Sequence, residues 1–468
     1  MHTLSCQPDI GYEEPAIELV HADDEPHGFH AAATRAAFDL FILINATLFL
    51  RPAEIIPGLA GWPIYEVLNV ICISLCFPQM MQKLRGARLV AAPVVACVLG
   101  LQLSVVLSDL SHLEFDSAVT CATDFAKVLA YFLMLITVVD TPQRLRAFLM
   151  SLLVFTTVLT ALALMHFHGW VNIPAMAAAK ELWGGDDGES GELLRLCAAG
   201  IYGNPNDLAR ILVVGMILAL YWIMAKDSGP IRFLWVGPFL MMGYALQLTH
   251  SRGGLLALMA GMALLFKMRF GWFKSILAGF VVAPIMLVAF SGRQLEMSTS
   301  SGTGQQRIQL WAEGLSYLHN TPLFGIGMNR YQEYVGLAAH NSFVQCFVDL
   351  GFIGGTLFVS ANLLALWGAH RAGHVARSVL GGEIDRLRPY MIAIIGSAIV
   401  GMFSSTRSYT IPTYTILGVA QCYQELVESR TGTPEIPLTW RLTRQLIMLG
   451  FVSLAFIYVY VRLFAVWE

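Results

Sequence analysis

Apolar stretches of about twenty residues recur along almost the whole chain, and this feature restricts the possible folds more than any other. Each stretch is long enough to cross a hydrocarbon core of roughly 30 Å as a helix. Inside lipid the backbone must satisfy its own hydrogen bonds, so stretches this long are helices and not barrel strands. Hydrophobic residues make up 56% of the 468 residues and charged residues 13%, against about 25% charged in soluble domains. We therefore expect an all-α, polytopic integral membrane helical bundle.

The apolar stretches predict about 12–13 transmembrane helices in one transmembrane domain, residues 35–468. The candidate spans are roughly 36–50, 64–81, 89–108, 118–139, 145–165, 205–225, 231–249, 253–268, 272–291, 342–369, 389–404, 410–427 and 445–466. Residues 1–34 are acidic at their start and interrupted by prolines, which predicts a disordered tail. The two longest connections are 166–204 and 291–341.

Connections on the two sides of this bundle differ in their content of lysine and arginine. One set holds 17 of these residues and the other set, which contains both long connections, holds 8. By the positive-inside rule the first set and the N-terminal tail are cytoplasmic. We therefore expect the loops 166–204 and 291–341 to lie outside.

The outer connections are unusual in the kind of cation that they carry. Seven of their eight cations are arginines: Arg51, Arg195, Arg252, Arg293, Arg307, Arg330 and Arg407. A guanidinium is always charged and offers a planar fork that fits phosphate. Snorkelling or pairing with acidic residues of the 181–192 segment remains an alternative for any single arginine. As a group at one membrane face, they favour an anionic ligand.

Two short motifs place polar residues at the outer ends of spans. "RLCAAGIYGNPNDLAR", residues 195–210, carries Arg195 and then an Asn-Pro-Asn turn in which Asn204 and Pro205 suit a helix start. "THSRGGLLAL", residues 249–258, puts Arg252 in a very short turn followed by two glycines. Those glycines let another backbone or a ligand approach closely.

The long loop 291–341 contains one helical pattern. Ile308, Trp311, Leu315 and Leu318 recur at helical spacing, with polar residues between them. This pattern predicts a short amphipathic helix on the membrane surface with Trp311 at headgroup depth. Pro322 and the sequence "GIG" at 325–327 end it.

A histidine stands at the end of this loop, in "LAAHNSFVQCFVDLGFIGG", residues 337–355. His340 can be a helix cap, a metal ligand, a general base or an ordinary surface histidine. Asn341 or Ser342 alone can cap the following helix, so capping does not require His340. The positive end of the helix dipole disfavours a protonated imidazole, and neutral imidazole is what a general base requires. Gly351 and Gly355 predict a small-residue face for tight helix packing.

In this order the motifs "R…GNPNDLA", "SRGGLLAL", "RIQLW…PLFGIG" and "HNSFVQCFVDLGFIGG" resemble the bacterial O-antigen ligase and polymerase family of membrane glycosyltransferases. The resemblance covers roughly residues 195–360. It implies a donor glycan on undecaprenyl diphosphate at the periplasmic face of a bacterial inner (cytoplasmic) membrane, in contact with membrane lipid, and so makes the loops 166–204 and 291–341 periplasmic. It also implies a glycan acceptor, which is lipid A–core for a ligase and the growing glycan for a polymerase. No cofactor, metal or nucleic acid is implied.

The resemblance also assigns roles to residues. His340 corresponds to the family histidine that acts on the acceptor hydroxyl, and Arg195, Arg252 and Arg307 to arginines that engage the donor. We add as further candidate ligands of the diphosphate or glycan Asn206, Asn341, Arg210, Arg293 and Arg330. Together they predict a metal-independent, inverting transfer, by a ligase first and a polymerase second. A transporter or flippase of an anionic lipid is the rival class, and Asp124 and Lys127 in one span are its best sign.

Overall fold

The computed structural model describes residues 29–465, apart from residue 60 and the segments 185–189, 290–301, 376–381 and 432–435. Thirteen helices of these residues form the bundle. They are α1 (Phe29–Leu50), α3 (Ile64–Lys83), α5 (Pro93–Ser111), α6 (Phe115–Val138), α7 (Pro142–Phe167), α8 (Pro205–Ile223), α9 (Val236–Leu248), α10 (Arg252–Phe270), α11 (Trp272–Ala289), α14 (Ser342–Val375), α15 (Gly382–Met402), α16 (Ile411–Thr431) and α17 (Trp440–Phe464). The connections hold α2 (Pro52–Ile55), α4 (Gly86–Ala91), α12 (Gly302–Tyr317), α13 (Tyr331–Val335) and a hairpin of β1 (Ala179–Gly184) and β2 (Ser190–Arg195).

Ten helices of the described chain are long and apolar enough to cross a membrane, so the protein is a multi-pass helical membrane protein, as the sequence predicts. The number of such helices is smaller than the predicted 12–13. The three other predicted spans are helical too, as α11, α15 and α16. Polar residues account for two of the differences: Arg386 and Arg388 lie in the first turns of α15, and Gln421 and Glu425 lie within α16.

Most of the predicted disordered tail, residues 1–28, lies outside the described residues. Helix α1 begins at Phe29, six residues before the predicted boundary of the transmembrane domain.

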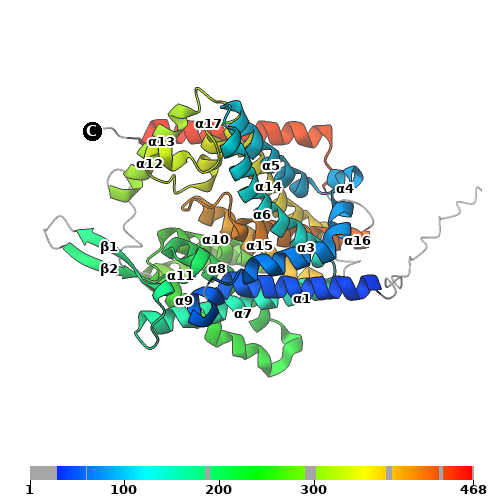
Figure 1. Cartoon of the computed structure of the whole chain (residues 1–468). Helices are drawn as coiled ribbons and strands as arrows, with labels where there is room; N and C mark the ends of the chain where they lie inside the picture. The colour runs from blue at the N-terminus through cyan, green and yellow to red at the C-terminus, as the bar shows by residue number, and fades with distance from the viewer. Residues whose placement is uncertain are drawn as a thin grey trace, which may run out of the picture.

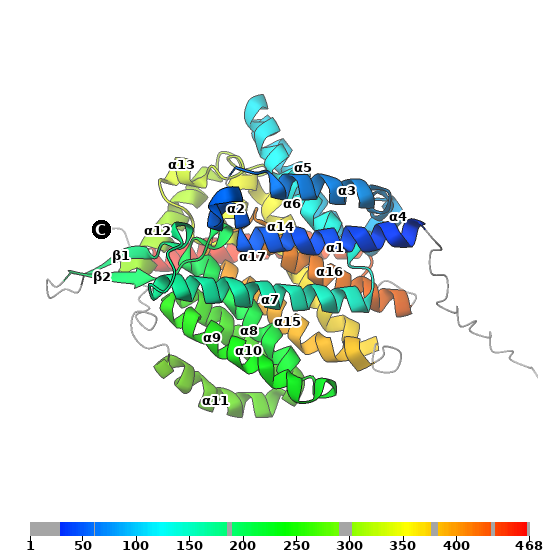
Figure 2. The ribbon, with the colours of Figure 1, turned by 60° about the horizontal axis from the view of Figure 1, so that its bottom comes forward.

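The helices run between two ends of the bundle (Figures 1 and 2). The hairpin, α12, α13 and the start of α14 lie at one end, which we call the His340 end. The start of α1 and helix α4 lie at the opposite end. Both long connections are therefore on the same side of the molecule, as the lysine and arginine distribution predicts. Helix α17 reaches the His340 end with its C-terminal turns, where the Tyr458 hydroxyl donates to the Leu315 carbonyl at 3.0 Å.

The amphipathic helix of the long loop is present as α12, but its apolar face is covered by protein. Ile308, Leu315 and Leu318 are buried, and α12 packs against α14 and α17. The Trp311 indole N–H donates to the Ala339 carbonyl at 2.6 Å. The prediction of a helix lying on the lipid surface is therefore wrong, because neighbouring helices bury the face that lipid would cover.

Helix α14 is interrupted at Gly351, where φ is 66° and ψ is −166°. The chain from Pro322 to Gly327 crosses the helix there. The Phe352 amide donates to the Pro322 carbonyl at 2.8 Å, and the Gly327 amide to the Asp349 carbonyl at 2.9 Å. A Cβ on Gly351 would lie 2.3 Å from the Leu323 carbonyl carbon. The glycine predicted to serve helix–helix packing thus serves a crossing of two backbones.

Candidate active site

The start of α14 is fixed to the connection between α15 and α16, residues 403–410. The side-chain oxygen of Asn341 accepts from the amides of Phe343 and Val344 at 3.0 and 3.2 Å, so Asn341 caps the helix. The Ser342 hydroxyl donates to the Ser405 carbonyl at 2.6 Å and accepts from the Arg407 amide at 2.9 Å. The two bonds of Ser342 therefore hold the 403–410 connection next to His340.

Within the part of the chain that the structure describes, the hydrogen bond that holds His340 is made by its backbone. Its φ is 49°, in the left-handed region, and its amide donates to the Thr406 hydroxyl at 2.8 Å. The bond from Trp311 to Ala339 fixes the preceding peptide. Its side chain is half-buried, so the imidazole is available for chemistry while the main chain is fixed on both sides.

Burial lowers the pKa of His340 below its usual value of 6.5, and the nearby charges of Arg307 and Arg407 lower it further. Asp207 opposes this shift. The imidazole is therefore neutral at pH 7, which is the state that accepts a proton.

The pKa of His340 leads to a test in the pH profile. If the neutral imidazole is the base, kcat/KM falls only below pH 6.5, because the neutral form persists to lower pH. In Arg307→Gln one of the charges that disfavour the protonated ring is removed, so the acid limb moves to higher pH. A pH series of initial transfer rates measures this. An acid limb above pH 6.5 in the natural protein, or one that does not move in Arg307→Gln, contradicts the assignment.

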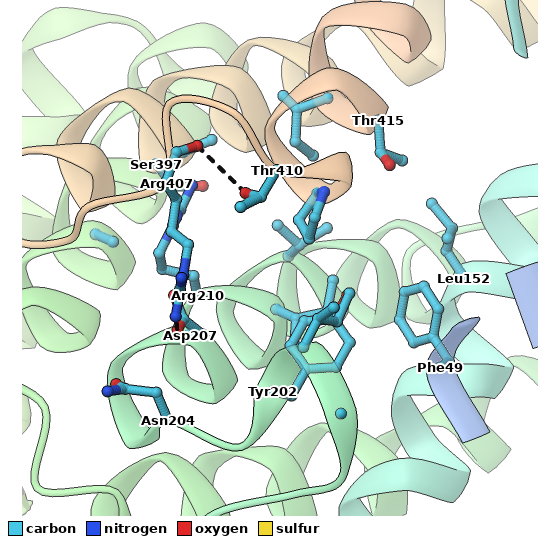
Figure 3. Close-up of a pocket in the computed structure, with 18 of the residues that line it drawn as sticks. Phe49, Leu152, Tyr202, Asn204, Asp207, Arg210, Ser397, Arg407, Thr410 and Thr415 are labelled. Atoms are coloured by element: carbon cyan, nitrogen blue, oxygen red, sulfur yellow. Dashed lines mark hydrogen bonds and ion pairs between the residues drawn. The ribbon is translucent and has the colours of Figure 1, made fainter. Parts of the chain in front are cut away.

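A cavity of about 370 Å³ opens beside this connection (Figure 3). One wall is apolar and comes from α1, α7, α8, α10, α15, α16 and the Gly200–Tyr202 turn. It is formed by Phe49, Leu152, Ile201, Tyr202, Ile211, Val214, Ala257, Ala398 and Ile416. The other end is polar and is formed by Asn204, Asp207, Arg210, Arg407 and Thr410. The cavity thus offers one amphiphilic ligand an apolar wall and a charged end.

The charged end is organised around one buried carboxylate. The Arg407 guanidinium donates to both oxygens of Asp207, with Nε to Oδ1 at 2.7 Å. Asp207 is 6% exposed and Arg407 is 37% exposed. Arg210 lies beside them in Figure 3 and donates from Nη1 to the Ser405 hydroxyl at 3.1 Å. Its Nε is buried and has no hydrogen-bond partner among the described residues.

Two arginines and one carboxylate therefore leave a net positive charge at this end. Arg210 was a candidate ligand on sequence grounds. Asp207 and Arg407 were not, although Asp207 lies in the quoted "GNPNDLAR" motif and Arg407 among the seven outer arginines. One sequence feature could have predicted this pair. Asp207 lies in the first turn of an apolar helix, and a carboxylate that is buried there needs a cationic partner.

Arg195 and Asn206 lie together at the His340 end. Arg195 donates from Nε to the Thr249 carbonyl at 2.9 Å, from Nη1 to Glu181 at 3.0 Å and from Nη2 to the Asn206 side chain at 3.1 Å. The same Asn206 oxygen accepts from the Ser251 hydroxyl at 2.8 Å. This network joins β2 to the starts of α8 and α10.

Arg252 is the first residue of α10, directly after the Ser251 cap. A Cβ on Gly253 would lie 1.8 Å from the Ser404 hydroxyl oxygen, and one on Gly254 would lie 2.6 Å from the Ala209 Cβ. The two glycines therefore permit the close approach that the sequence predicts. They pack the start of α10 against α8 and the 403–410 connection, so Arg252 lies at the same end as His340.

The remaining predicted ligands lie apart from one another. Arg307 is on α12 and lies near enough to His340 to lower its pKa. Arg330 is 16% exposed and pairs with Glu114, and it also donates to the Ser117 hydroxyl at 2.9 Å. Arg293 lies outside the described residues. The structure thus places Arg307 near His340, joins Arg210 to Ser405 in the connection that holds the His340 turn, and places Arg330 against the α5–α6 connection.

Residues 237–359 match a family model described as O-antigen ligase. This segment of the chain is therefore similar to the O-antigen ligase family. The matched segment runs from α9 to the middle of α14 and includes Arg252, Arg307 and His340. No curated protein matches the chain. His340 does not line the cavity itself, but its amide binds Thr406, which precedes the lining residue Arg407, so this cavity is the candidate active site.

Proposed function

We propose that this chain is an O-antigen ligase that transfers a glycan from undecaprenyl diphosphate to an acceptor hydroxyl, with lipid A–core as the acceptor. The transfer occurs at the periplasmic face of the bacterial inner membrane. The observation that carries the proposal is the cavity whose charged end, with Arg210 and Arg407, adjoins the His340 turn. Its apolar wall suits the first isoprene units of a lipid, and its guanidinium groups suit a diphosphate.

In the proposed reaction the acceptor oxygen attacks the anomeric carbon of the donor sugar. The carbon–oxygen bond to the diphosphate breaks with its electron pair, and the lipid diphosphate departs with the added negative charge. Arg210 and Arg407 stabilise that charge, and Arg195, Arg252 and Arg307 with Asn206 complete the predicted donor and glycan contacts. The neutral imidazole of His340 accepts the acceptor proton from the opposite face, so the anomeric centre inverts.

Arg407→Lys tests whether a forked cation is required. Lysine keeps the charge but cannot bind both Asp207 oxygens and a phosphate oxygen in one plane. We expect kcat/KM to fall about 10²-fold, as when a single charge-stabilising donor is lost. Arg386→Lys is the matched control, because Arg386 also pairs with an aspartate, Asp227, but at the opposite end. Equal turnover by the two variants contradicts a diphosphate role for Arg407.

The acceptor separates a ligase from a polymerase. Purified protein is incubated with an undecaprenyl-diphosphate-linked glycan, with and without lipid A–core. Product that forms only with lipid A–core supports the ligase. Lengthening of the lipid-linked glycan without lipid A–core supports a polymerase of the same family. Absence of both products with an active donor contradicts the proposal.

The pair that best favoured a transporter, Asp124 and Lys127, does not lie in the interior of the bundle. Lys127 and Asp124 pair at 2.8 Å, as predicted, but their side chains are 70% and 56% exposed. They therefore lie on the outside of the bundle and not along a path through it. The break in α14 at Gly351 is likewise filled by backbone from residues 322–327.

A further inference from the structure

A second cavity lies at the opposite end of the bundle from His340. It has a volume of about 490 Å³ and lies between α10 and α17, with α14 and α15 behind it. Its walls are formed by Leu264, Met268, Leu363, Leu364, Leu366, Trp367, Ile392, Leu442, Leu446 and Leu449. Its polar lining residues are Lys267, His370 and Gln445. None of its residues lines the cavity of the candidate active site.

The polar residues are gathered at one end of this cavity. Lys267 is in the last turn of α10 and His370 is near the end of α14, whereas Gln445 is near the start of α17. The leucine Leu363 lies seven residues before His370, which is about 10 Å deeper along the helix. The cavity therefore runs from a charged rim into the apolar interior of the membrane layer.

Tryptophans mark the depth of the charged rim. Trp272 and Trp367 are 67% and 41% exposed. The Lys267 ammonium lies 5.3 Å from the Trp272 ring, and the Arg371 guanidinium lies 5.7 Å from the Trp367 ring. Exposed tryptophans with adjacent cations are typical of the headgroup level of a bilayer. The rim is therefore at the height where lipid phosphates lie.

Helix α17 leaves this cavity open towards lipid. Among the described residues α17 packs mainly against α12 and α14, and large side chains such as Met448 and Phe451 are more than half exposed. Two further cations, Arg441 and Arg444, lie exposed in its first turns. An uncovered apolar groove with a basic rim matches a lipid whose headgroup is negatively charged.

We propose that this groove binds an anionic phospholipid of the leaflet opposite His340. One acyl chain lies between α10 and α17, and the phosphate lies against Lys267. The occupant would fasten the peripheral helix α17, whose other end supports α12 and the Trp311 contact beside His340. The groove is separate from the donor site, so the proposal does not depend on the proposed reaction.

Native mass spectrometry of the purified full-length protein tests this proposal with phosphatidylglycerol and phosphatidylethanolamine of identical acyl chains. We expect phosphatidylglycerol to bind at least about fivefold more tightly, and Lys267→Gln to remove about that factor, since one cation near the headgroups is worth about 1 kcal/mol. Leu446→Trp, which fills the groove, should weaken both lipids. Lys274→Gln is the matched control, because Lys274 lies at the same end outside the groove and should change binding less than about twofold.

Thermal unfolding of each variant in detergent verifies that it is folded before binding is compared. Equal binding of the two lipids overturns the proposal. It is also overturned if a preference for phosphatidylglycerol survives in full in Lys267→Gln, or if Leu446→Trp binds both lipids as tightly as the natural protein.

Discussion

Replacing His340 is expected to reduce glycan transfer by about 10²–10⁴-fold, the usual contribution of a general base. His340→Ala removes the base, but alanine is disfavoured at the positive φ of 49° that this residue adopts. His340→Asn is therefore the sharper variant, because asparagine tolerates that conformation and has no basic nitrogen at neutral pH. Initial rates with saturating donor and acceptor measure the loss.

His319→Ala is the matched control for both variants. His319 also lies at the His340 end, is exposed, and contacts the Ser316 carbonyl and the Tyr458 ring. Among the described residues it makes no hydrogen bond to the 403–410 connection that borders the cavity, so its removal should leave the rate within about twofold. If His340→Asn is folded and retains more than a tenth of the natural rate, His340 is not the base.

Gly351→Ala is expected to give the largest loss of stability. The backbone there adopts φ 66° and ψ −166°, a region that is essentially restricted to glycine. A Cβ would also lie within 2.4 Å of backbone atoms of Leu323 and Phe324, which cannot move without breaking the bonds from Pro322 to Gly327. Strain and overpacking together amount to roughly 2–6 kcal/mol.

The effect of Gly351→Ala is measured as the yield of monodisperse protein and as the thermal midpoint in detergent. Gly279→Ala is the control, since Gly279 lies inside α11 and, apart from its own helix, no atom of the described residues lies within 4 Å of the position of a Cβ. Alanine there should be neutral or stabilising by up to about 1 kcal/mol. Equal midpoints for the two variants would show that the crossing of the backbones is not rigid.

Helix type and the placement of both long loops at one end of the bundle could be predicted from the sequence because each depends on a local property. Long apolar runs must be helical in lipid, and the lysine and arginine distribution placed the two long loops at one end. The role of Gly351 could not be predicted in this way. Two glycines four residues apart look the same in the sequence whether they face another helix or a crossing loop. Only the contact of Gly351 with Leu323 in the structure shows that the neighbour is a loop.

The separate motifs of the candidate site could be predicted from the sequence, but the contacts between distant residues could not. The His340 turn, the Arg252 turn and the Asn206 turn are recognisable motifs, and the structure brings them to one end of the bundle. The bond between Asp207 and Arg407 joins residues 200 positions apart, and no local pattern specifies it. The same holds for Trp311, whose bond to Ala339 replaces the predicted contact with lipid headgroups.

The most direct test of the account is an experimental structure with a lipid-diphosphate-linked glycan bound. We predict that diphosphate oxygens lie about 2.7–3.2 Å from the guanidinium groups of Arg210 and Arg407, with the lipid against Phe49 and Val214. The His340 ring should face the anomeric carbon from the side opposite the diphosphate. A diphosphate bound elsewhere, or a His340 ring turned away from the sugar, would contradict the account.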